Sequence, residues 1–134
     1  MELVLGLPTP GLSPTATEVA IITVASHFGA AYPMYAHEHQ ARDITNLTEE
    51  QIAALKTGTK PVGLDEQSDA AYEVARELVE KKGPMSKGRW DDAVRIFGMD
   101  GALSLINYVG FYSYICMVVN AVDTPVPEGV NWKW

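Results

Sequence analysis

The stretch that decides the fold is residues 13–42, which reads SPTATEVAIITVASHFGAAYPMYAHEHQAR. From Val19 to Ala25 only Thr23 is polar, as in a helix that is covered on most sides. Gly29 is typical of a helix end, and Pro33 is tolerated in the first turn of a following helix, where a backbone N–H is dispensable. Because the connection is so short, we predict an antiparallel pair of helices at about residues 14–28 and 31–45.

The rest of the chain continues with helical periodicity and has no convincing alternating strand pattern. Thr48 and Ser86 are typical helix N-caps, Gly58 is a typical helix end, and Pro84 breaks a helix. We therefore predict one all-α domain over residues 1–134, with about six helices. The other four are expected at about residues 48–58, 64–82, 87–97 and 99–122, with an extended lead-in at 1–12 and an extended tail at 123–134.

The composition is that of a globular protein without a nucleic-acid partner. Hydrophobic residues make up 47% of the 134 residues and charged residues 20%, which excludes a disordered chain. The net charge is −7 and no basic cluster occurs, so nucleic-acid binding is not expected. The single cysteine, Cys116, excludes an internal disulfide, and the N-terminus lacks the basic region of a secretory signal. These features favour a cytoplasmic protein.

One segment, residues 102–122, has no charged residue over 21 positions and is long enough to span a membrane. Asn107, Asn120 and three tyrosines interrupt it, and its flanks are Asp100 and Asp123 rather than lysine or arginine. We expect a buried core helix and no membrane partner. The first and last helices are nevertheless very apolar for a small monomer, so a homo-oligomer is predicted.

Two histidines in the second helix raise the question of a metal site. His37 and His39 lie two positions apart, hence about 200° around a helix, and point to opposite faces. Zinc-binding pairs on helices are three or four positions apart, and His27 has no acidic residue at ligand spacing. We therefore expect no metal and no cofactor.

His37 is the stronger candidate for acid–base chemistry. It shares a largely apolar helix face with Pro33 and Met34, whereas His39 shares a more polar face with Tyr35. A neutral imidazole in an apolar pocket can take up and return protons near neutral pH. The alternative interpretation of His37 is an ordinary core histidine with a satisfied hydrogen bond.

Glu18 favours the catalytic interpretation of His37. It lies on the apolar stripe of the first helix, where a carboxylate needs a partner. Counted from the turn at Gly29, the two residues differ by roughly 6 Å in level along the paired helices, so their side chains can meet. A buried glutamate that orients a histidine is a usual arrangement for proton transfer. The alternative is a capping box in which Glu18 serves Thr15.

These residues carry a resemblance to a known family. The stretch 16–58, ATEVAIITVASHFGAAYPMYAHEHQARDITNLTEEQIAALKTG, resembles the carboxymuconolactone decarboxylase family of the alkylhydroperoxidase D-like superfamily. Relatives share a glutamate in an apolar helix, then G-x-x-Y-x-x-x-A-H, which Gly29, Tyr32, Ala36 and His37 match here. The last helix, LINYVGFYSYICMVVNAVDTPVPEG, is also similar, so the resemblance covers residues 13–129.

The resemblance implies an all-α fold that assembles as trimers or hexamers, with active sites near subunit contacts. It also implies a proton relay through Glu18 and His37. In the peroxidase members two cysteines complete the site, but Ala30 and Pro33 stand at those positions here. Without a thiolate there is no nucleophile for peroxide, so thiol peroxidase activity is disfavoured. The sequence also departs from the decarboxylase members around residues 32–34, which leaves the substrate unassigned.

We therefore expect a cofactor-free lyase that acts on a small organic acid or lactone, as in the catabolism of aromatic compounds. His37 would be the general acid/base and Glu18 its orienting partner, in a decarboxylation, isomerisation or lactone opening. The residues predicted to bind substrate are Tyr32, Tyr35, Tyr108, Tyr112, Met34 and His39.

Each of these predicted residues has an alternative interpretation. Every tyrosine is also a candidate core or interface residue. Arg89 or Arg42 could hold a substrate carboxylate, although Arg42 is also spaced to pair with Glu38, four positions before it. For the whole chain, the alternative is a binding or scaffold oligomer with the same fold and no catalysis.

Overall fold

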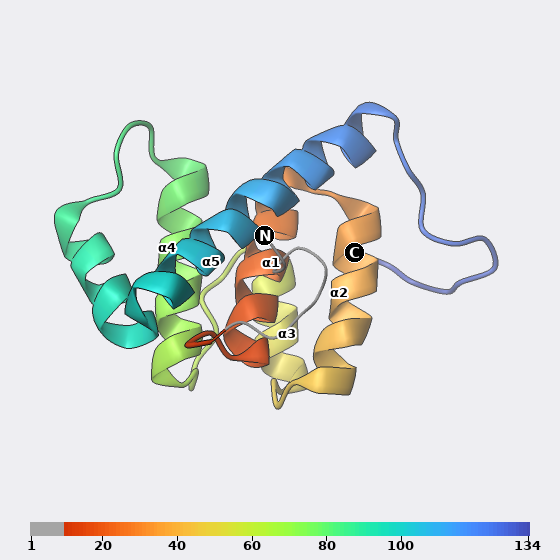
Figure 1. Cartoon of the computed structure of the whole chain (residues 1–134). Helices are drawn as coiled ribbons and strands as arrows, with labels where there is room; N and C mark the ends of the chain where they lie inside the picture. The colour runs from red at the N-terminus through yellow and green to blue at the C-terminus, as the bar shows by residue number, and fades with distance from the viewer. Residues whose placement is uncertain (1–9) are drawn as a thin grey trace.

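Residues 10–134 form five α-helices, and four of them pack around the first (Figure 1). The structure is a computed structural model that describes residues 10–134. The helices are α1 (Pro14–Phe28), α2 (Ala31–Ile44), α3 (Glu49–Lys56), α4 (Glu66–Glu80) and α5 (Lys87–Ala121). No strand occurs in this described part, so the predicted all-α class is confirmed.

α1 occupies the centre because it is apolar on nearly every side. It contacts each of the other four helices, with α2 and α4 on either side and α5 crossing it obliquely (Figure 1). Nine of its 15 residues are buried. Burying a valine or isoleucine side chain contributes about 1.5–3 kcal/mol, so the covered sides of α1 supply much of the core.

The first helix pair is defined by a cap and a turn. The Ser13 hydroxyl accepts the backbone N–H of Ala16 at 3.1 Å and begins α1. Gly29 ends it with a φ of 63°, a left-handed conformation that glycine adopts without strain. The predicted capping box of Thr15 and Glu18 is wrong, because Ser13 takes the N-cap position and Glu18 lies inside the core.

α5 corresponds to two of the predicted helices. Its backbone is non-helical at Gly98, with φ 73° and ψ 168°, and continues as helix on both sides. The helices predicted at 87–97 and 99–122 are therefore both present and meet at Gly98. Together they form α5, so residues 10–134 hold five helical elements where about six helices were expected. The break lets the second part of α5 turn toward α1 and α2 (Figure 1).

A close contact fixes the described start of the chain against α5. A Cβ placed on Gly101 would lie 2.9 Å from the Cβ of Phe97 and 3.3 Å from the carbonyl of Gly11. Leu12 is buried in the core. Most of the predicted extended lead-in, residues 1–9, lies outside the described residues.

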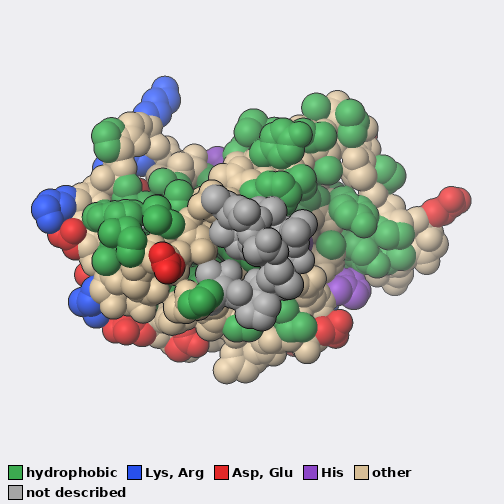
Figure 2. Space-filling model, viewed as in Figure 1, with side chains coloured by type: hydrophobic (Ala, Val, Ile, Leu, Met, Phe, Trp, Pro, Cys, Tyr) green, Lys and Arg blue, Asp and Glu red, His purple; other side chains and the backbone are tan. Residues whose placement is uncertain are grey.

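α5 has a buried inner face and an apolar outer face. It is long and apolar enough to cross a membrane by length and composition, and 33% of its most apolar stretch is buried inside the protein. Leu105, Val109 and Cys116 face the core. Hydrophobic side chains also gather on the surface over α5 (Figure 2). The exposed members on this helix are Met99, Leu103, Tyr114, Met117 and Val118, and the exposed Val122 follows as its C-cap.

We predict that Gly98→Ala lowers the free energy of unfolding by about 1–2 kcal/mol, because an alanine is strained at a φ of 73°. The matched control is Gly88→Ala in the same helix, where an added Cβ meets nothing within 4 Å and the backbone is not left-handed. That change should be neutral or slightly stabilising. Urea unfolding of both variants measures the difference, and equal effects would contradict the assigned break.

Candidate active site

The candidate site is a buried glutamate–histidine pair between α1 and α2. His37 Nδ1 lies 2.8 Å from Glu18 Oε2. Glu18 is 2% exposed and the His37 side chain 12% exposed. The short turn at Gly29 makes the two helices antiparallel and brings residues 19 positions apart to the same level. The contact predicted from the sequence is therefore present.

This pairing determines which nitrogen of His37 is available. An ionised carboxylate can only accept hydrogen bonds, so Nδ1 carries the proton and donates to Glu18. The other nitrogen, Nε2, then has a lone pair. Within residues 10–134, Nε2 has no hydrogen-bond partner. The partly accessible imidazole thus presents Nε2 on the side away from the Glu18 carboxylate.

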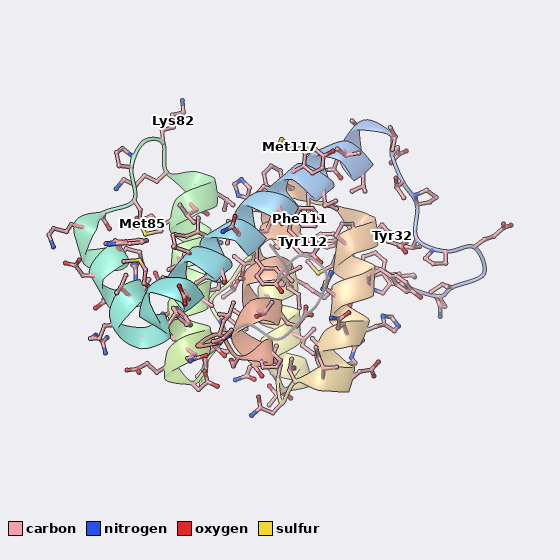
Figure 3. All side chains as sticks on the ribbon, in the orientation of Figure 1. Tyr32, Lys82, Met85, Phe111, Tyr112 and Met117 are labelled. Carbon is pink, nitrogen blue, oxygen red and sulfur yellow. The ribbon has the colours of Figure 1, made fainter. Side chains whose placement is uncertain are left out.

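Two tyrosines of α5 lie beside the pair. The Tyr112 ring packs edge to face on the His37 ring, with 5.0 Å between the ring centroids. Tyr108 stacks on Tyr112, with 6.5 Å between their ring centroids. Tyr112 extends from α5 toward α1 and α2 (Figure 3). Burial, together with the nearby Glu18 charge, raises the pKa of Tyr112 to about 12. The hydroxyl therefore keeps its proton at neutral pH and can donate a hydrogen bond.

The remaining predicted substrate-binding residues lie elsewhere on α2. Tyr35 contacts His39 at 4.6 Å and Tyr32 at 6.4 Å between ring centroids. His39 is exposed, with its Nδ1 2.9 Å from the Tyr35 carbonyl oxygen. Tyr32 is 40% exposed and extends toward the C-terminal tail (Figure 3). These three form a separate aromatic group, because positions on different sides of a helix cannot converge on His37.

Met34, also predicted to bind substrate, is buried in the core. It lies on the same side of α2 as His37, as its spacing predicts, but none of its surface is exposed. A side chain with no exposed surface contributes to the core and does not contact a substrate in this arrangement. Among the predicted substrate-binding residues, therefore, Tyr108 and Tyr112 are the ones grouped with the pair.

The thiol of Cys116 is enclosed and poorly suited to nucleophilic chemistry. The residue is fully buried, and burial raises its pKa from the ordinary 9.0 to about 11. At neutral pH the sulfur is therefore a thiol, whereas nucleophilic attack requires a thiolate. Within the described residues, no group of three or more histidine, cysteine or acidic side chains is placed to hold a metal ion.

Sequence reasoning missed a second buried carboxylate, Glu38, which is 5% exposed. Its expected partner Arg42 is present at 2.8 Å, but Lys56 of α3 and Trp132 of the tail also bind it, at 3.1 Å and 2.6 Å. Burial alone would raise the pKa of Glu38, yet the hydrogen bonds from Trp132, Lys56 and Arg42 outweigh it and lower the pKa. Only the Arg42 spacing gave a signal in the sequence.

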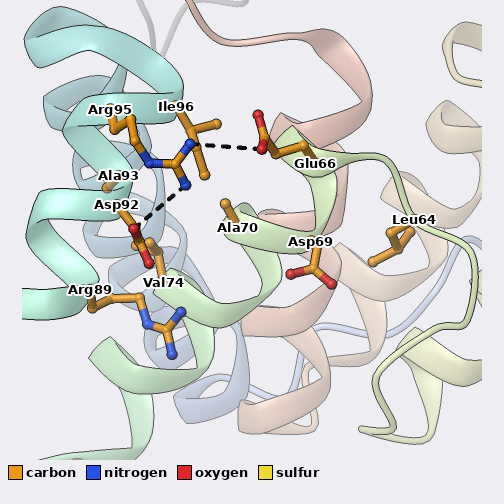
Figure 4. A pocket seen from close by; sticks show the side chains of 10 residues that line it. All are labelled: Leu64, Glu66, Asp69, Ala70, Val74, Arg89, Asp92, Ala93, Arg95 and Ile96. Carbon is orange, nitrogen blue, oxygen red and sulfur yellow. Dashed lines mark ion pairs between the residues drawn. The ribbon is translucent and has the colours of Figure 1, made fainter.

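Neither arginine that was considered for a substrate carboxylate is available at the pair. Arg42 binds Glu38 and also Glu49 at 3.0 Å. Arg89 lies 3.3 Å from Glu73, at a hollow of about 340 Å³ between α4 and the first part of α5 (Figure 4). The polar lining of that hollow is largely paired internally, as Arg95 reaches toward Glu66 and Asp92 (Figure 4).

Neither a scan against protein-family models nor a search of curated proteins found a match to this chain. The candidate site is therefore defined by its own geometry, with the buried Glu18 and the oriented His37 at its centre.

We predict that Cys116 reacts with iodoacetamide about a hundredfold more slowly at pH 8 in the native protein than in the urea-unfolded chain. A pKa near 11 against 9.0 lowers the thiolate fraction by about that factor, and enclosure slows the reaction further. Mass spectrometry over time measures the labelling. Equal rates in the two states would contradict the burial of Cys116.

We also predict that Glu38→Gln lowers the free energy of unfolding by about 1–3 kcal/mol at pH 7, since Lys56 and Arg42 lose a buried charged acceptor. The pKa of Glu38 in the folded protein is lower than its usual 4.5, so its stabilising contribution is present above pH 4.5 and is lost as the pH falls below it. Wild-type protein should therefore lose stability more steeply than the variant below pH 4.5. The exposed Glu50→Gln is the control, and parallel curves for wild type and Glu38→Gln would refute the assignment.

Proposed function

We propose that the chain is a cofactor-free acid–base enzyme that acts on a small organic acid or lactone. One observation carries this proposal: a carboxylate 2% exposed lies 2.8 Å from Nδ1 of a partly accessible histidine. A buried charge of this kind is expensive unless it is paired, and here its partner is an imidazole, a side chain that can both donate and accept a proton. The arrangement is suited to proton transfer at Nε2.

The same geometry suggests how His37 would work. As a base, Nε2 would take a proton from a carbon next to a carbonyl, and the resulting imidazolium would be stabilised by Glu18. In a decarboxylation the bond from carbon to the leaving carboxylate breaks, the electron pair forms an enolate, and a protonated His37 then donates its Nε2 proton to that carbon. The Tyr112 hydroxyl would donate a hydrogen bond to the enolate oxygen.

The sequence pattern supports a place among the carboxymuconolactone decarboxylase-like proteins of the alkylhydroperoxidase D-like superfamily. The spacing from Glu18 through Gly29 and Tyr32 to His37 agrees with it. Ala30 and Pro33 at the two thiol positions, and the enclosed Cys116, argue against peroxide reduction. We accordingly propose a cytoplasmic lyase rather than a thiol peroxidase.

The exposed apolar face of α5 supports assembly into a trimer or hexamer. Tyr114 and Met117 are 60% and 54% exposed on a segment without charged residues, and covering them would remove apolar surface from water. The same face is the observation that favours the alternative function, a scaffold or binding oligomer in which His37 is only structural. Kinetic tests of His37 separate the two functions.

We predict that His37→Ala lowers turnover at least a hundredfold on whichever substrate of a panel of β-oxo acids and carboxylated lactones is turned over. Carbon dioxide release follows decarboxylation, and proton release follows lactone opening. Glu18→Gln, which keeps the shape but removes the charge, should lower it about tenfold to a hundredfold. His27→Ala, an exposed histidine at the other end of α1, is the matched control. Unchanged rates in His37→Ala would favour the scaffold.

We predict that sedimentation at micromolar concentration shows a species of at least three chains. Met117→Glu should shift it toward monomer, because it places a charge on the apolar face of α5. Val62→Glu introduces the same charge at an isolated hydrophobic residue that is 90% exposed, and should leave the assembly intact. A monomer in the wild-type protein would contradict the proposed assembly.

A further inference from the structure

The end of the chain returns to the helix that carries His37. After α5 ends, the tail runs outward and comes back against α2 (Figure 1). The Trp132 indole Nε1–H donates to Glu38 Oε2 at 2.6 Å, and the Lys56 ammonium donates to the Lys133 carbonyl oxygen at 3.1 Å. We call residues 131–134 the C-terminal latch. The predicted extended tail is thus without helix, and residues 132 and 133 are hydrogen-bonded to α2 and α3.

Trp132 makes two further contacts through its indole ring. The Lys56 ammonium lies over the Trp132 ring at 5.1 Å from its centroid, a cation–π arrangement. Tyr35 of α2 meets the same ring edge to face at 6.1 Å. Trp132 therefore joins α2, α3 and the tail, while Trp134, two residues later, is 49% exposed.

α2 depends on such tertiary contacts because its own start is weakly fixed. Its N-cap, Ala30, provides no side-chain hydrogen bond, in contrast to Ser13 of α1 and Thr48 of α3. A helix of 14 residues without a side-chain cap is marginal alone, so its position is set by what its side chains contact.

Adjacent residues of α2 are anchored in different directions. His37 binds Glu18 of α1, and Glu38 binds Lys56 of α3 and Trp132 of the latch. Successive residues point about 100° apart around a helix, so the two anchors together fix its rotation. Met34 and Ala41, on the same side of α2 as His37, are also fully buried, and the Glu38 anchor adds a fixed contact on a different side of the helix. Loosening that anchor gives α2 more freedom to rotate and to carry the imidazole away from Tyr112.

We propose that Trp132 is a positioning residue, which acts through Glu38 to hold α2 in the rotation at which His37 meets Glu18. This inference deepens the proposed function: the catalytic meaning of the His37 position rests on that function. The docking of the latch onto α2 does not depend on it. The latch thus makes the C-terminal end of the chain part of the support of the candidate active site.

The test is hydrogen exchange of the full chain, followed by mass spectrometry, in Trp132→Ala and in the matched control Trp134→Ala. Trp132→Ala removes a hydrogen bond to a buried charge, so exchange of α2 amides should accelerate about tenfold, with α1 and α4 unchanged. Trp134→Ala should leave α2 as in wild type. Unaltered exchange of α2 in Trp132→Ala would overturn the latch.

A second measurement reports on His37 itself. Modification by diethyl pyrocarbonate should be at least about threefold faster at His37 in Trp132→Ala than in wild type, since a helix that opens more often exposes its side chains. The exposed His27 in the same molecule should react at an unchanged rate. Trp132→Phe restores a ring over Lys56 without the N–H. Its His37 modification rate should lie between those of wild type and Trp132→Ala. Equal His37 rates in all three proteins would overturn the positioning role.

If Trp132→Ala does not fold, hydrogen exchange of the indole N–H groups in the wild-type protein tests the latch instead. The indole N–H of Trp132 should exchange with deuterated water at least about tenfold more slowly than that of Trp134, because it is bonded to a buried carboxylate. Equal exchange would overturn the latch. Slow exchange together with unimpaired turnover in His37→Ala would uphold the latch while refuting the proposed enzyme.

Discussion

The structure depends on the requirement that α1 be covered on every side. A helix this apolar cannot lie at the surface, so α2, α3, α4 and α5 all pack on it. The short turn at Gly29 places α2 directly alongside α1, antiparallel to it. Glu18 is then the single acidic residue of a central helix. Its carboxylate loses water when the core forms, and the His37 imidazole replaces part of what is lost.

The two buried carboxylates, Glu18 of α1 and Glu38 of α2, have different hydrogen-bond partners. Glu18 is paired with the imidazole of His37, whereas Glu38 accepts from the guanidinium of Arg42, the ammonium of Lys56 and the indole N–H of Trp132. The first arrangement is suited to chemistry and the second to holding helices together. Both act on α2, which explains how a helix with a polar surface and no side-chain cap becomes a fixed support.

Local sequence signals predicted those features of the structure that are set over one or two turns of chain. The positions of α1 and α2, the Gly29 turn and the approach of Glu18 to His37 follow from periodicity and helix geometry. The alternative interpretation of Glu18, a capping box with Thr15, is wrong because Ser13 takes the N-cap position of α1. Trp132 was missed since its contact joins residues 94 positions apart, and no local pattern indicates such a partner.

The break at Gly98 separates the rotational setting of the two parts of α5. In an unbroken helix of 35 residues, one inserted residue would turn every later side chain by about 100°, and Tyr112 would leave His37. A glycine outside the helical region can absorb a change in chain length that occurs before it. The rotational setting of Tyr112 beside His37 is therefore not fixed by that of residues 87–97.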